Sequence, residues 1–141
     1  MAEHARSRET TAAPERVWQI WSQPATWQEW NPTVESVRLD GPFAAGTTGT
    51  MRTKGGRTHA IRLREVEPGR SFRLEATAVP LSKFVFRCAV TPGAGGRTTI
   101  TQGVTMEGPL GPVYSPIMGE QVAKSFEPIL EGLAAKAEGR R

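Results

Sequence analysis

The sequence predicts an α+β fold with a seven-stranded antiparallel sheet, two short helices between the first and second strands, and a long C-terminal helix. Polar and apolar residues alternate along four successive segments between Thr58 and Glu107, which is typical of half-buried strands. Apolar residues recur at helical spacing between Pro112 and Glu138. All four tryptophans fall between Trp18 and Trp30, in a stretch interrupted by prolines. Strands followed by one terminal helix favour a sheet whose apolar face is covered by that helix.

Length and composition favour one globular domain over residues 1–141, with 38% hydrophobic and 23% charged residues. The single Cys88 excludes an internal disulfide and a multi-cysteine metal site, so we expect no metal and a reducing compartment. No signal peptide and no membrane span are expected, which predicts a cytoplasmic protein. The net charge of +4 is scattered along the chain, so no nucleic-acid interface is expected. The oligomeric state is left open.

The N-terminal part is expected to form a strand over His4–Ala12 and then two short helical segments. Pro14 suits the first turn of a helix, in which Trp18 and Trp21 share one face. Pro24 ends that helix, and residues 25–30 form a second short turn. Four indoles are too much apolar surface for two short helices to bury alone, so a sheet must lie beside them.

Strands are predicted over residues 33–39 and 47–53, followed by a tight turn at Gly55-Gly56. The four alternating strands follow, over residues 58–66, 71–79, 83–91 and 98–107. Their inward faces are expected to carry His59, Ile61, Leu63, Phe72, Leu74, Ala76, Phe84, Phe86, Cys88, Val90, Ile100, Gln102, Val104 and Met106. The opposite faces carry arginines, Glu75 and Lys83, which favours a solvated face with cross-strand ion pairs.

The C-terminal helix is predicted over residues 112–138, with an apolar face that includes Tyr114, Met118, Gln121, Val122 and Phe126. Pro128 is expected to kink it, because proline lacks a backbone donor and crowds the carbonyl four residues earlier. Residues 134–141 are expected to fray, and Gly119 is expected to leave room for a ligand.

Four segments of the chain resemble the START-like helix-grip superfamily, in its polyketide cyclase/dehydrase and lipid-transport branch. They are Ala13-Pro14-Glu15-Arg16-Val17-Trp18, Trp27-Gln28-Glu29-Trp30-Asn31-Pro32, Gly41-Pro42-Phe43-Ala44-Ala45-Gly46-Thr47 and Val66-Glu67-Pro68-Gly69-Arg70. The resemblance covers essentially the whole chain. It implies a curved sheet wrapped around the C-terminal helix, with an apolar cavity between them for a hydrophobic ligand.

Three functions are compatible with that resemblance, because one fold hosts many activities. The first is a carrier or sensor of a small hydrophobic molecule, such as a lipid, a polyketide or an aromatic compound. The second is a small cyclase or dehydratase enzyme that uses the same cavity, although no nucleophile–base or carboxylate–histidine spacing is visible. The third is a surface-acting relative of the chaperone activators. No catalytic residue and no cofactor are predicted.

The predicted ligand-binding residues combine the inward strand positions with the first half of the helix and one tryptophan. They are Trp30, His59, Ile61, Leu63, Phe72, Leu74, Phe84, Phe86, Cys88, Gln102, Val104, Met106, Tyr114, Met118, Gln121 and Val122. For the apolar members, plain core packing is the alternative interpretation. Among the polar ones, His59 either contacts ligand or bonds a neighbouring residue, and Cys88 is interpreted as a buried, inert thiol.

Overall fold

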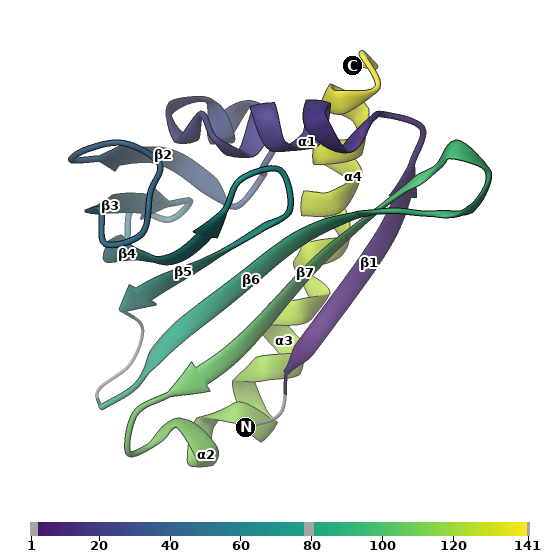
Figure 1. Ribbon diagram of the computed structural model, residues 1–141. Helices are drawn as coiled ribbons and strands as arrows, with labels where there is room; N and C mark the ends of the chain where they lie inside the picture. Colours follow the sequence, from purple (N-terminus) through teal and green to yellow (C-terminus); the bar gives the residue numbers. More distant parts are fainter. Residues whose placement is uncertain (1–2, 78–80, 141) are drawn as a thin grey trace.

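A computed structural model of the protein describes residues 3–77 and 81–140 (Figure 1). The strands are β1 His4–Thr10, β2 Val34–Leu39, β3 Thr48–Thr53, β4 Thr58–Glu67, β5 Ser71–Thr77, β6 Lys83–Pro92 and β7 Thr98–Glu107. The helices are α1 Pro14–Trp21, η1 Pro24–Glu29, η2 Ala94–Gly96, α2 Gly111–Tyr114, η3 Ser115–Gly119, α3 Glu120–Lys124 and α4 Phe126–Ala137.

The seven strands form one antiparallel sheet in the order β1-β7-β6-β5-β4-β3-β2. Figure 1 shows the sheet curving beside the C-terminal helices, with α1 at one end of it. The predicted fold class is therefore confirmed. Most boundaries agree with the expected ones, and the predicted end of the strand at residue 79 lies outside the described residues.

The aromatic stretch forms the two helical segments that the prolines predict. Val17 and Trp21 of α1 and Trp27 of η1 are buried, and the Trp27 indole N–H donates to the Trp21 carbonyl at 3.0 Å. Phe72 of β5 meets three of the four indole rings, with ring centroids 5.4 to 6.3 Å apart. The contacts of Trp18 and Trp21 are edge-to-face and that of Trp27 is stacked, and both arrangements stabilise aromatic clusters, which fixes α1 and η1 against the sheet.

The C-terminal helix differs from the single helix predicted. An α-helical turn leads into a π-helical turn over Ser115–Gly119, and a break at Ser125 separates α3 from α4. Ser125 lies three residues before Pro128, so the break fits the kink expected from that proline. The predicted fraying from residue 134 is wrong, because α4 continues to Ala137 and Ala134 is fully buried.

The first half of this helix region faces the sheet with small residues rather than with the predicted large ones. Gly111, Ser115, Gly119 and Ala123 are buried at a spacing of four, whereas Gln121 is exposed. A Cβ atom on Gly119 would overlap the His4 ring, so that space holds His4 and not a ligand. The expectation for Gly119 is therefore wrong, because the helix approaches β1 too closely.

The outer face of the sheet carries the predicted cross-strand ion pairs. Arg64 contacts Glu107 at 2.7 Å and Glu75 at 3.9 Å, and Lys83 contacts Glu75 at 3.2 Å. Glu75 is nevertheless buried, and so is Val85 beside it in the β5–β6 register. Long cationic side chains cover apolar surface with their stems, which explains a buried valine on a polar face.

Candidate functional site

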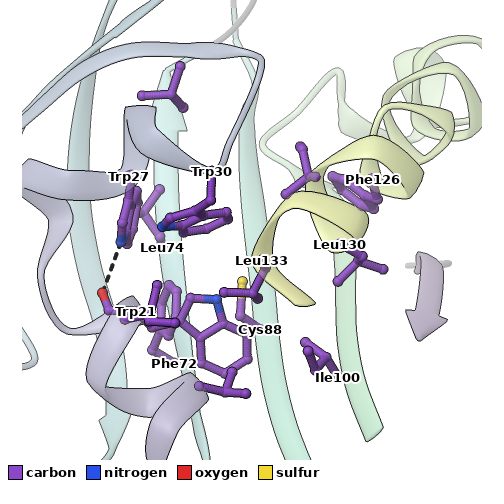
Figure 2. Packing of buried hydrophobic residues seen from close by; sticks show 14 of the residues in the cluster. Trp21, Trp27, Trp30, Phe72, Leu74, Cys88, Ile100, Phe126, Leu130 and Leu133 are labelled. Atoms are coloured by element: carbon purple, nitrogen blue, oxygen red, sulfur yellow. Dashed lines mark hydrogen bonds between the residues drawn. The ribbon is translucent and has the colours of Figure 1, made fainter. Parts of the chain in front are cut away.

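A pocket of about 200 Å³ lies between the inner face of the sheet, η1 and the C-terminal helices. Its walls are mainly aromatic and aliphatic side chains. Figure 2 shows several of them converging from η1, the sheet and α4. The lining residues are Trp21, Trp27, Trp30, Asn31, Thr33, Val34, Met51, Thr53, His59, Phe72, Leu74, Ala76, Phe84, Phe86, Cys88, Gln102, Val122, Ser125, Phe126 and Ile129.

The exposed fractions of the lining side chains show where the pocket opens to the surface. Most of its half-buried members come from β3, β4, β6 and α3, and they include Thr53, His59, Phe84 and Val122. The tryptophans, Phe72, Cys88 and Gln102 are buried and form the deeper part. The pocket therefore opens between the β3–β4 hairpin, β6 and α3.

The register of the sheet explains why Cys88 and Gln102 meet at the deep end. Cys88 on β6 lies directly between Phe72 on β5 and Gln102 on β7. All three side chains point to the inner face, because they occupy one row across the pleat. This row is covered by Phe126 and Ile129 of α4, which line the same pocket.

Cys88 is an inert thiol in this setting. It is buried and unpaired in any disulfide, and burial raises the pKa of its thiol to about 12. The nearby Arg87 guanidinium opposes that rise but does not cancel it. Since only the thiolate is a strong nucleophile, Cys88 contributes surface to the pocket rather than covalent chemistry.

His59 sits at the mouth with both ring nitrogens near partners. Nδ1 lies 2.8 Å from the Thr77 carbonyl oxygen, so it carries the proton and donates to that oxygen. Nε2 then accepts from the Thr53 hydroxyl at 3.4 Å. The neighbour-bonded arrangement considered for this histidine is therefore the one that the structure contains. Its predicted part in ligand binding stays a prediction.

Two further polar groups of the pocket wall, on Asn31 and Trp30, differ in whether they have a hydrogen-bond partner. The Asn31 side-chain oxygen accepts from the backbone N–H of Thr33 at 2.9 Å and from its hydroxyl at 2.7 Å. Within residues 3–77 and 81–140, the Trp30 indole N–H is buried without an acceptor. No lining residue in these ranges is an Asp, Glu, Lys or Arg. The interior therefore suits an uncharged guest.

The structure divides the predicted ligand-binding residues into two groups. Those that line the pocket are Trp30, His59, Phe72, Leu74, Phe84, Phe86, Cys88, Gln102 and Val122. Those that do not are Ile61, Leu63, Val104, Met106, Tyr114, Met118 and Gln121. The strand residues of the second group are packed in the interior away from the pocket. The helix residues of this group do not face the sheet, because small side chains occupy the sheet-facing positions of the helix.

The predicted site left out lining residues from the helices, from β5 and from the neighbourhood of β2 and β3, which are Trp21, Trp27, Asn31, Thr33, Val34, Met51, Thr53, Ala76, Ser125, Phe126 and Ile129. Asn31, Thr33 and Val34 follow η1, and Met51 and Thr53 lie on β3. The alternation of β3 offers a weak signal, since Met51 and Thr53 share one face opposite Arg52. The curvature that brings these residues to the mouth is not readable from alternation.

The protein family described as polyketide cyclase/dehydrase and lipid transport matches residues 1–138. The chain belongs to this family. The resemblance to the START-like superfamily is thereby confirmed. The comparison with curated proteins gave no match.

Solved structures share the fold over nearly the full chain. The protein XoxI from Bacillus cereus has a TM-score of 0.79 at 18% identity, with 98% of this chain and 96% of that chain covered. A START superfamily protein from Mycobacterium smegmatis has a TM-score of 0.74 at 15% identity, with 97% of each chain covered. Truncated norcoclaurine synthase from Thalictrum flavum has a TM-score of 0.74 at 12% identity, covering 99% and 95%. These identities support a shared fold alone.

None of the helices in the described ranges is long and apolar enough to cross a lipid bilayer. The same ranges contain no group of three His, Cys, Asp or Glu side chains arranged to hold a metal ion.

Proposed function

We propose that the protein is a carrier or sensor that binds a small, uncharged hydrophobic molecule in the pocket between the sheet and the C-terminal helices. The observation that carries the proposal is the composition of the pocket wall, which is aromatic and aliphatic and has no charged side chain among the described residues. Apolar walls with a few polar groups are the usual composition of small-molecule sites.

The volume limits the size of the ligand. A cavity of about 150 Å³ lined by aliphatic and aromatic side chains holds benzene in another protein, so a pocket of about 200 Å³ suits roughly ten non-hydrogen atoms. One aromatic ring with substituents, or two fused rings, has this size. A long acyl chain exceeds it, so we favour an aromatic compound over a lipid.

Acid–base catalysis in this pocket has little support. His59 and Cys88 are the titratable groups of the described lining; the pKa of the thiol is too high for it to ionise near neutrality, and the His59 nitrogens are bonded to neighbours. General acid–base catalysis needs a titratable group held at the reacting atoms.

An interior that is hollow rather than filled also favours ligand binding over a purely surface-acting role.

Native mass spectrometry of the purified protein, followed by organic extraction, tests the proposal together with calorimetric titration of p-xylene. We expect either a co-purifying uncharged aromatic compound or saturable binding of one p-xylene per chain. A protein that carries no such compound and also fails to bind p-xylene would contradict the proposal.

A further inference from the structure

Gln102 is a buried polar side chain in the deeper part of a mainly apolar pocket. It lies on β7, keeps 9% of its surface exposed and is a lining residue of the pocket. Its neighbours in the register are Cys88 on β6 and Arg6 on β1. The amide therefore lies halfway along β7, which is the second strand from the β1 edge of the sheet.

Within residues 3–77 and 81–140, the Gln102 side-chain amide forms no hydrogen bond with another protein group. The neighbouring polar groups are engaged elsewhere. Arg6 binds the Ala5 carbonyl oxygen and the carboxylates of Glu120 and Glu127. The Ser125 hydroxyl donates to the Val122 carbonyl oxygen at 2.6 Å. The thiol of Cys88 is a weak donor and a weak acceptor.

The Gln102 amide atoms are not among the fully enclosed polar atoms that lack a partner, so they reach the pocket space, where water satisfies them when no ligand is bound. A ligand that displaces this water without replacing its hydrogen bonds loses affinity, whereas a ligand group that bonds to the amide keeps it. An amide offers both a donor and an acceptor, so it can bind a hydroxyl group in either direction or donate to a carbonyl oxygen. A carboxylate is a poor guest, since no lining residue of the described chain is cationic.

We propose that Gln102 determines ligand specificity and selects neutral aromatic compounds that carry a hydroxyl or carbonyl oxygen at the end that enters the pocket first. This inference rests on the proposed function, since it assigns a chemical class to the ligand of the same pocket. The aromatic walls bind the ring, and Gln102 distinguishes an oxygen-bearing ring from a plain hydrocarbon. A site with a buried polar group discriminates in this way against analogues that cannot bond to it.

Two probes of nearly the same shape separate these contributions. p-Cresol and p-xylene differ only by a hydroxyl in place of a methyl group. Calorimetric titration is carried out with the wild type, with Gln102→Met and with the control Gln28→Met, which makes the same change at an exposed position on η1. Methionine keeps the unbranched shape of glutamine and removes the amide.

The ratio of the p-xylene Kd to the p-cresol Kd is the quantity that reports on Gln102. We expect Gln102→Met to lower this ratio about tenfold, with p-xylene binding kept or tightened, and Gln28→Met to leave it unchanged. An unchanged ratio in Gln102→Met would overturn the inference while leaving the proposed function intact. Loss of binding of both probes by the wild type would overturn the inference and the proposed function together.

A spectroscopic measurement on the wild type tests the same inference, and its result does not depend on the stability of the Gln102→Met variant. The side-chain NH₂ signals of Gln102 are assigned in a ¹H–¹⁵N spectrum by their absence from Gln102→Met. We expect p-cresol to shift them strongly and p-xylene to shift them weakly. Equal shifts with both probes would show that the amide does not sense the hydroxyl group. Urea unfolding of Gln102→Met should show no loss of stability, because the substitution removes an unpaired amide from the interior.

Discussion

Filling the pocket should stabilise the protein while it abolishes binding. Ala76 on β5 lines the pocket and is 2% exposed, so a larger side chain at this position extends into empty volume. Ala76→Ile adds three carbon atoms, and isoleucine suits a strand. At about 0.8 kcal/mol for each buried carbon, the substitution adds about 2 kcal/mol to the free energy of unfolding.

The volume of the pocket sets an upper limit for this gain. At about 24 cal/mol per Å³, an empty space of about 200 Å³ costs roughly 5 kcal/mol, so a gain of about 2 kcal/mol corresponds to partial filling. Urea denaturation measures the stability, and calorimetric titration measures p-xylene binding. Ala60→Ile is the matched control, because Ala60 is exposed on β4 and should change neither quantity appreciably.

Two results would refute this reasoning. A loss of 1 kcal/mol or more in Ala76→Ile would indicate that the added atoms meet packed side chains, since overpacking costs about 1–3 kcal/mol. Undiminished p-xylene binding in a stabilised variant would place the ligand outside the pocket.

The other predictions concern the core, the thiol and acid stability. Trp21→Ala should lower the free energy of unfolding by about 3–5 kcal/mol in urea titrations, and Trp18→Ala by less, because Trp21 is 1% exposed whereas Trp18 is half-buried; equal losses would contradict this packing. Cys88 should not react with a thiol reagent at pH 8 until the protein unfolds, because burial raises its pKa to about 12; rapid labelling of the native protein would refute it. The hydrogen bond from the Thr10 hydroxyl, followed by that from Arg140, lowers the pKa of Glu138 below its ordinary value of 4.5, so the stabilisation is present above that pH and is lost as the pH falls through the folded pKa. Glu138→Gln should therefore flatten the loss of stability below pH 4.5, and an unchanged pH profile would contradict the assignment.

Strand alternation and proline positions carried most of the fold prediction. The inward sets of β4 to β7 follow from period-two alternation, because each of these strands has one face in the core. Pro14 likewise predicts where α1 begins, and Pro24 predicts the break between α1 and η1. Alternation and proline positions are local features of the sequence, so they can be recognised without knowledge of tertiary contacts.

The pocket could be predicted only in part, because alternation identifies a face and not the depth of a side chain on it. Leu63 and Leu74 are opposite each other on β4 and β5, yet only Leu74 lines the pocket. The sheet-facing side of the C-terminal helix was predicted less well than the inward faces of the strands. Its large residues suggested the sheet-facing side, whereas contact with β1 requires small residues such as Gly119 and Ala123.

The indole N–H signals of the four tryptophans provide the most direct test of the pocket as a binding site. Trp21, Trp27 and Trp30 line it and Trp18 does not, so each signal reports on a known position. Assigned ¹H–¹⁵N spectra are recorded during a p-xylene titration. We predict saturable shifts of the three lining indoles with one common Kd, and the smallest shift for Trp18. Unchanged signals for Trp21, Trp27 and Trp30 at saturating p-xylene would contradict ligand binding in this pocket.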